Sequence, residues 1–163
     1  MFKLFSSIII SILTIMTYSS LDKNTDPFSN LDKDTAQTLT NFYRFWETGD
    51  ENYLEASTSK NLIDHDKNPT LQLTDYDAIL QTGQSLKGLS DMKHTFTEIL
   101  PQADGRIVIR WQGSAIHSGE VFGLPATGRT IYFNGHDILQ LKDGKIVELW
   151  HIEQLLQMTL QMQ

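Results

Sequence analysis

The segment from Phe133 to Glu153, FNGHDILQLKDGKIVELWHIE, limits most strongly how this chain can fold. Two runs rich in β-branched and large apolar residues flank Asp143-Gly144, a dipeptide that favours the two-residue turn of a β-hairpin. We therefore expect antiparallel strands over residues 130–141 and 145–153. The same segment carries several titratable side chains, more than a hairpin needs for packing alone, so it is also a candidate for part of a functional site.

Counting outward from the turn predicts which hairpin residues share a face, because directly opposed residues project from the same side of a sheet. This regular register places His136 opposite His151, with Asp137 on the other face. A bulge at Gly135 would reverse the parity and bring Asp137 to the side of His151. A histidine pair with a purely structural role, at a sheet end or dimer contact, is the alternative. The polar end of the predicted face consists of Asn134, His136, His151 and Glu153.

The remainder of the chain reads as helices followed by strands. Helices are expected over residues 35–48, 51–57 and 76–86, further strands over 93–100 and 106–117, and a frayed helix or tail at the end. Helices before a meander of at least four antiparallel strands indicate an α+β fold, with helices over one face of a curved sheet. We expect a single domain over residues 34–163, preceded by a flexible leader at 21–33.

The first twenty residues, MFKLFSSIIISILTIMTYSS, differ in kind from the rest. A lysine precedes an apolar run of about nine residues, which suits the core of a signal peptide better than a membrane span. Thr17 and Ser19 suit the small-residue positions of a cleavage site. We expect cleavage and export to the periplasm or the medium; an uncleaved anchor is the alternative.

Charge and cysteine content exclude several classes of function. The formal net charge is −7, and no cluster of lysine and arginine is present, which argues against binding to nucleic acid or anionic lipid. The absence of cysteine excludes disulfides, thiolate metal sites and a cysteine nucleophile.

Several motifs, in order and at suitable spacing, resemble those of the SnoaL-like polyketide cyclases, within the nuclear-transport-factor-2-like (cystatin-like) superfamily. They comprise a strand with Arg-Trp, a His-x-Gly turn, a G-x-P-x-T-G loop and a D-G-K-I-V-E hairpin, and the segment DHDKNP is similar to a His-Asn-Pro motif. The resemblance covers roughly residues 35–160. The matching positions are Arg110, Trp111, His117, Gly119, Gly123, Pro125, Thr127, Gly128, Asp137, Ile138, residues 143–148 and Trp150.

The resemblance implies a cone-shaped fold, in which a curved antiparallel sheet and N-terminal helices packed on its concave face enclose an apolar pocket. It also implies cofactor-free chemistry, with a pocket carboxylate as general acid/base in an intramolecular aldol cyclisation. In the cyclases this carboxylate follows the tryptophan of a His-Trp-Asp tripeptide. Here the tripeptide is Leu149-Trp150-His151, so a histidine stands at the position of the carboxylate.

We therefore hypothesise acid/base chemistry on a small hydrophobic carbonyl compound, with a histidine suited to neutral pH by its ordinary pKa of about 6.5. His151 is expected to remove a proton α to the carbonyl, or to activate water. His136 is expected to donate a hydrogen bond to the developing oxyanion. Asp137 or Glu153 is expected to orient an imidazole.

The expected substrate-binding residues divide into apolar and polar groups. Trp111 and Phe122 are expected to bind an apolar ring. His117 shares strand parity with Trp111, and the family motif places a histidine near the cavity mouth at the position of His65. The polar lining is expected to include His65, His117, Asn134 and Glu153. A homodimer is expected, through the exposed sheet face.

Two alternatives come from other classes of function. One is an exported, non-catalytic domain of the same fold that binds a small molecule. The other is a metal site, because imidazoles and a carboxylate could hold zinc. Its candidate ligands are His117, His136, His151 and Glu153.

Overall fold

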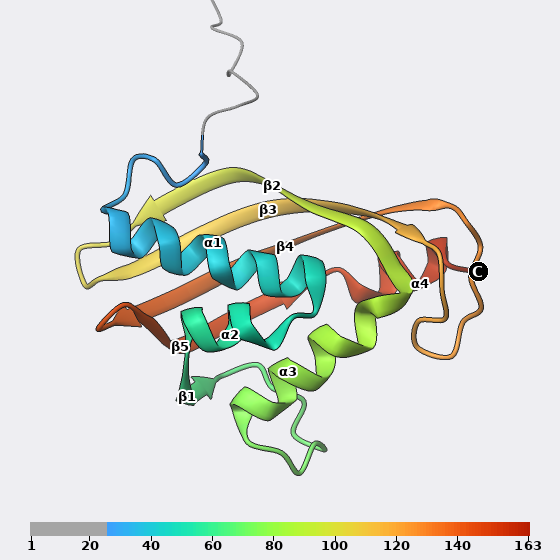
Figure 1. The fold of residues 1–163 in the computed structure, drawn as a ribbon, viewed down its shortest axis with the longest axis horizontal. Helices are drawn as coiled ribbons and strands as arrows, with labels where there is room; N and C mark the ends of the chain where they lie inside the picture. Colours follow the sequence, from blue (N-terminus) through green and yellow to red (C-terminus); the bar gives the residue numbers. More distant parts are fainter. Residues whose placement is uncertain (1–25) are drawn as a thin grey trace, which may run out of the picture.

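The computed structural model describes residues 26–163, so the expected signal segment, residues 1–20, lies outside the described part. Figure 1 shows a curved five-stranded sheet with helices packed against one side. Its strand order is β1-β5-β4-β3-β2. The elements are α1 (Lys33–Thr48), α2 (Glu51–Ser57), β1 (Thr58–Asp64), α3 (Asp75–Ser85), the 3₁₀ turn η1 (Leu86–Gly88), β2 (Leu89–Pro101), β3 (Arg106–His117), β4 (Thr130–Lys142), β5 (Lys145–Glu153) and α4 (Leu155–Gln161).

Helix α1 follows from its apolar spacing and its caps. Leu39, Phe42 and Tyr43 recur at helical intervals and are buried against the sheet. The carboxylate of Asp32 accepts a hydrogen bond from the backbone N–H of Thr35 at 3.0 Å. The helix therefore begins two residues before the expected start. It ends at Gly49 in the left-handed conformation, φ 67°, which favours glycine.

The segment before α1 packs into the core, although we expected a flexible leader there. Phe28 is only 2% exposed. Its ring stacks on Tyr43 with centroids 6.1 Å apart and lies 4.7 Å from the ring of Phe96. One apolar residue in a polar, turn-rich segment is too weak a pattern to reveal this anchoring from sequence.

Strand β1 was not expected, and it runs parallel to β5 at the edge of the sheet. Its sequence, TSKNLID, has little period-two alternation because an edge strand exposes much of its surface. The parallel pairing brings Asp64 beside Leu149. The expectation of an antiparallel sheet therefore holds for β2 to β5, and the whole sheet is mixed.

The predicted register of the hairpin is wrong beyond its first pairs. Leu141 pairs with Ile146 as expected, but Gln140 then pairs with Glu148, which leaves Val147 as an extra residue in β5. This bulge reverses the parity from there to the strand end. Asp137 is therefore opposite His151. The alternative of a bulge at Gly135 in β4 thus predicts the correct parity, but the bulge lies at Val147 in β5.

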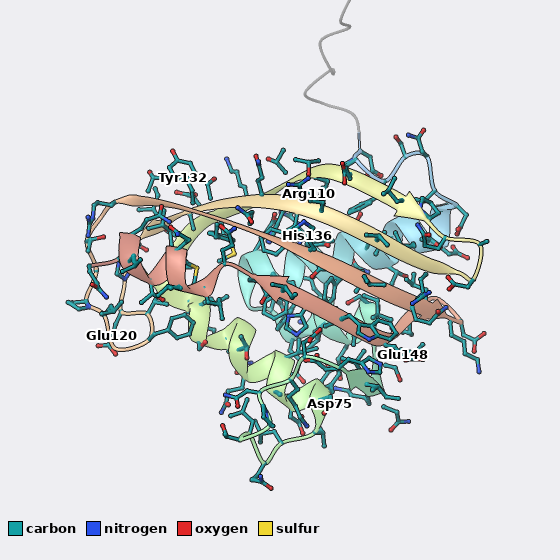
Figure 2. All side chains as sticks on the ribbon, turned by 180° about the vertical axis from the view of Figure 1, so that it is seen from behind. Asp75, Arg110, Glu120, Tyr132, His136 and Glu148 are labelled. Carbon is teal, nitrogen blue, oxygen red and sulfur yellow. The ribbon has the colours of Figure 1, made fainter. Side chains whose placement is uncertain are left out.

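His136 consequently lies on the outer face of the sheet, opposite Arg110 of β3. Figure 2 shows both side chains on the side turned away from the helices. His136 is exposed, whereas Asp137 is buried. The expected pairing of His136 with His151 is thus incorrect, because one inserted residue moves every later side chain of β5 to the other face.

The core lies between the helices and the inner face of the sheet. A second, smaller apolar cluster joins β2, β3 and β4 to α4 through Met158 and Met162. These layers confirm the expected α+β fold. Among residues 26–163, none of the helices has the length and apolar character that a membrane crossing requires.

Candidate functional site

A cavity of about 620 Å³ lies between the helices and the inner face of the sheet. α1 and α3 supply an apolar side through Phe42, Trp46 and Ile79. β4 and β5 supply three of its polar groups, Asp137, His151 and Glu153. Its size falls within the range of small-molecule sites in proteins.

Asp137 lies in the cavity wall and is held by two donors. Its Oδ2 accepts a hydrogen bond from the Tyr43 hydroxyl at 2.6 Å and another from Trp111 Nε1 at 2.7 Å. Asp137 is 4% exposed. Its second oxygen, Oδ1, has no hydrogen-bond partner within residues 26–163 and is not among the fully enclosed polar atoms there. That oxygen is therefore free to meet a ligand.

Burial raises the pKa of Asp137 to about 6, because a desolvated carboxylate is disfavoured. The negative charge of Glu153 raises this pKa further, while the hydrogen bonds from Tyr43 and Trp111 and the charge of His151 partly offset the rise. A carboxyl with a pKa close to the working pH can both take and return a proton.

Gly135 creates the space that Trp111 needs to reach Asp137. A Cβ at position 135 would lie 2.4 Å from Cζ2 of Trp111 and 2.8 Å from the backbone oxygen of Ile152. Glycine is thus required by close packing, and it allows the indole to pass close to β4 with Nε1 at the carboxylate.

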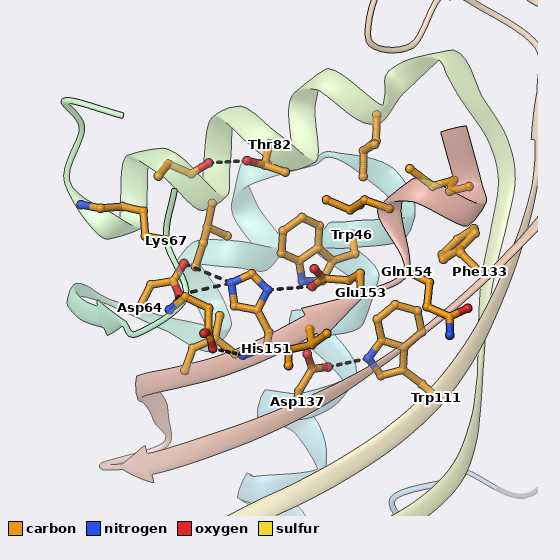
Figure 3. Close-up of a pocket in the computed structure, with 18 of the residues that line it drawn as sticks. Trp46, Asp64, Lys67, Thr82, Trp111, Phe133, Asp137, His151, Glu153 and Gln154 are labelled. Atoms are coloured by element: carbon orange, nitrogen blue, oxygen red, sulfur yellow. Dashed lines mark hydrogen bonds and ion pairs between the residues drawn. The ribbon is translucent and has the colours of Figure 1, made fainter. Parts of the chain in front are cut away.

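His151 lies between two carboxylates, as Figure 3 shows. Its Nδ1 is 2.7 Å from Glu153 Oε1, and its Nε2 is 3.2 Å from Asp64 Oδ1. The backbone N–H of His151 donates to Asp66 Oδ2 at 2.8 Å, just beyond the end of β1. Residues 64–66 therefore fix both the strand end and the ring.

The surroundings of His151 keep it positively charged at neutral pH. Burial lowers its pKa, but hydrogen bonds to Asp64 and Glu153 outweigh burial and raise that pKa to about 10. Both ring nitrogens donate to carboxylates in this state. A charged imidazole with both N–H groups engaged is poorly suited to removing a proton, which is the role that we expected for it.

Five of the expected site residues surround the cavity and four do not. Those that line it are Trp111, Phe122, Asp137, His151 and Glu153. His136 and Asn134 lie on the outer side of β4 for the reason of parity given above, and the Asn134 amide donates to Gln154 Oε1 at 3.1 Å.

His117 and His65 occupy structural positions away from the cavity. His117 is fully buried, and its Nδ1 is 3.1 Å from the Thr127 hydroxyl. The ring of His65 stacks on Trp150 at 4.1 Å, and its Nε2 is 3.0 Å from Glu148 Oε2. Trp150 projects from the face of β5 opposite to His151, so this stack lies outside the cavity.

Sequence reasoning missed Asp64 and Tyr43 as parts of the site. Asp64 ends a strand that has no clear pattern, and Tyr43 belongs to the apolar stripe of α1, where it looks like an ordinary core residue. The single available signal was the tyrosine hydroxyl, since a buried hydroxyl requires a partner.

The four candidate metal ligands do not converge. His136 is on the outer face of β4, and His117 bonds to Thr127. Across residues 26–163, no group of three or more histidine, cysteine, aspartate or glutamate side chains is arranged to hold a metal ion.

The fold is similar to several solved structures. TsrD from Streptomyces laurentii aligns with a TM-score of 0.67 at 22% identity, over 81% of this chain and 97% of TsrD. A proposed polyketide cyclase from Bacillus cereus aligns at 0.66 and 25% identity, over 79% and 80%. An epoxide hydrolase of Mycobacterium tuberculosis, described as LEH-like, aligns at 0.55 and 9% identity, over 77% and 86%.

The first and third of these likenesses concern the fold alone, because their identities are low. No curated protein matches the chain. The family model described as SnoaL-like polyketide cyclase matches residues 36–162, which is most of the chain. The matched range includes Asp137, His151 and Glu153 of the cavity. The chain therefore belongs to the SnoaL-like polyketide cyclase family.

Proposed function

We propose that this protein binds a small hydrophobic carbonyl compound in its cavity and catalyses reversible proton transfer at the carbon next to the carbonyl. Asp137, rather than His151, is the group that takes the proton. The proposal rests on one observation above all, a buried carboxyl in the cavity wall that has a raised pKa and one oxygen without a hydrogen-bond partner.

In the proposed step, Asp137 accepts the α-proton and the electron pair of the C–H bond moves onto the carbonyl oxygen, which gives an enolate. The enolate either takes the proton back or attacks a second carbonyl carbon of the same molecule, which is an aldol ring closure. In the ring closure, the electron pair of that second C=O bond moves onto its oxygen, which then takes the proton from Asp137 and becomes a hydroxyl group. The names of the relatives described as polyketide cyclases favour the second outcome.

Glu153 and His151 support this step through charge. The charged Glu153 repels the Asp137 carboxylate, so protonation of Asp137 relieves the repulsion and makes it a stronger base. His151 is a positioning residue, because its two ring nitrogens hold the carboxyl groups of Glu153 and Asp64 in place.

A direct test uses 2-tetralone, a bicyclic ketone with acidic α-protons, in deuterated buffer at neutral pH. Exchange of its α-protons is followed by proton NMR with and without protein. We expect the wild-type protein to accelerate exchange and Asp137→Asn to reduce the acceleration about 100-fold, which is the usual size of a general-base contribution. His136→Ala, on the outer face, is the matched control and should exchange like wild type.

The same assay separates the catalytic proposal from a binding domain of the same fold. Binding of 2-naphthol, a stable enol analogue of 2-tetralone, is measured by calorimetry. If the protein binds 2-naphthol tightly but does not accelerate the exchange of 2-tetralone, it is a binding protein and the catalytic proposal is rejected. Equal exchange in wild type and Asp137→Asn would remove Asp137 from its proposed role.

A further inference from the structure

A second histidine–carboxylate pair, His94 and Glu47, lies near the edge of the sheet, outside the hydrogen-bonded group around Asp137. Glu47, in the last turn of α1, accepts a hydrogen bond through Oε1 from the backbone N–H of His94 at 3.0 Å. The same oxygen is 3.3 Å from His94 Nδ1. β2 is an edge strand, in which the N–H groups that face away from β3 need another acceptor, and Glu47 supplies one for His94. One carboxylate thus fixes both the strand and the ring.

The ring of His94 lines the cavity although its side chain is only 4% exposed. Aromatic rings enclose it: Tyr43 at 5.2 Å, Trp111 at 5.0 Å, Phe133 at 6.3 Å and Phe96 at 6.4 Å between centroids. With Nδ1 held by Glu47, Nε2 lies on the far side of the ring. No group within residues 26–163 hydrogen-bonds to Nε2, and it is not among the fully enclosed atoms of that part of the chain.

His94 is also close to the proposed base. It packs against both Tyr43 and Trp111, the two residues that donate hydrogen bonds to Asp137. Asp137 and His94 therefore line the same cavity on either side of these two rings, within reach of one ligand of about two fused rings. An imidazole nitrogen that has no protein partner and is set among aromatic rings gains a hydrogen bond when a polar group of the ligand meets it.

We propose that Nε2 of His94 is a second polar anchor, which binds a hydroxyl group of the ligand at a distance from the carbonyl that reacts. This inference rests on the proposed function. It narrows the proposed substrate class to hydrophobic carbonyl compounds that also carry a hydroxyl group remote from the reacting carbonyl. A hydroxyl suits the position in either state of the ring, because it donates to a neutral Nε2 and accepts from a charged one. Glu47 acts as the positioning residue for the ring.

The test compares 2-naphthol with the dihydroxynaphthalene isomers by calorimetry, on the wild-type protein and on two variants. His94→Asn retains an amide where Nδ1 meets Glu47 and removes Nε2. His94→Gln places an amide near the position of Nε2. We expect at least one isomer to bind wild type about 10-fold more tightly than 2-naphthol, the size of one well-formed hydrogen bond to a buried group. That advantage should vanish in His94→Asn and return in part in His94→Gln.

The affinity for 2-naphthol itself should stay within about twofold in all three proteins, since it has no second hydroxyl. The subsite is rejected if no isomer gains over 2-naphthol, if the gain persists in His94→Asn, or if His94→Asn weakens 2-naphthol equally, which indicates a structural role. A wild-type protein that fails to bind 2-naphthol rejects the proposed function, and the subsite with it.

Discussion

At the scale of single residues, the environment that suits Asp137 to the proposed proton transfer also reduces the stability of the folded protein at neutral pH. The surroundings that raise its pKa disfavour its ionised form in the folded protein. The folded protein therefore holds a proton on Asp137 at pH values where the unfolded chain has already lost it. Stability from this group is complete below the ordinary pKa of 3.8 and declines as pH rises towards 6.

We predict that Asp137→Asn stabilises the protein at neutral pH while it removes activity. The amide carries no charge, and its oxygen can still accept the bonds from Tyr43 and Trp111. A pKa raised from 3.8 to about 6 corresponds to about 3 kcal/mol at neutral pH. Urea unfolding measures the free energy of unfolding of both proteins at pH 4 and pH 7.5. The difference between them should be small at pH 4 and close to the full value at pH 7.5. An equal difference at both values contradicts the assigned titration.

At the scale of elements, the β4–β5 hairpin and its bulge select which polar side chains enter the cavity. The extra residue at Val147 brings Asp137 and His151 to the inner face and leaves His136 outside. Across the next strand pair, Gly135 lets the Trp111 indole lie against β4. Backbone features of these strands thus determine which carboxyl group enters the cavity and allow the Trp111 indole to donate to it.

We predict that Gly135→Ala displaces Trp111 and costs about 1–3 kcal/mol of stability, as overpacking of a close contact does. Loss of the Trp111 hydrogen bond removes an interaction that lowers the pKa of Asp137, so the midpoint of the pH–rate profile should move above 6. Urea unfolding and the pH dependence of 2-tetralone exchange measure the two effects. Ser114→Ala, on the other face of β3, is the control, and an unchanged midpoint in Gly135→Ala contradicts the prediction.

At the scale of the whole molecule, segments far apart in the chain meet to complete the site. Residues before α1 anchor on Tyr43 through Phe28, and β1 crosses to β5 to bring Asp64 to His151. The outer sheet face, with Arg110, His136 and the 64% exposed Tyr132, is left without a covering layer among the described residues (Figure 2). The homodimer expected from the sequence remains a prediction, which sedimentation of the purified protein can test.

We predict that Phe28→Ala destabilises the protein by about 3–4 kcal/mol, the usual cost of truncating a buried phenylalanine. A flexible leader would give no such loss. Thermal unfolding measures the effect, with the exposed Asn30→Ala as the matched control in the same segment. Because Phe28 packs on Tyr43, a reduced rate of 2-tetralone exchange should accompany the loss.

Local patterns determined much of this protein in advance. The three N-terminal helices, the Asp143-Gly144 turn, the strands β2 to β5 and the family's motifs are all readable from the sequence, because apolar periodicity, caps and turn residues act over a few positions. The same patterns indicated the α+β fold and five of the residues that line the cavity. These features depend on neighbours in the chain.

Only the tertiary structure decided which of the candidate groups form the site. One extra residue in β5 places Asp137, and not His136, opposite His151, because side chains alternate between the two faces and a single insertion reverses every later one. Asp64 comes from β1, an edge strand without a clear sequence pattern. Together with Glu153 it keeps His151, the expected base, positively charged and fixed in position. Parity after a bulge and the pKa of a buried group depend on long-range pairing and burial, which no local pattern contains.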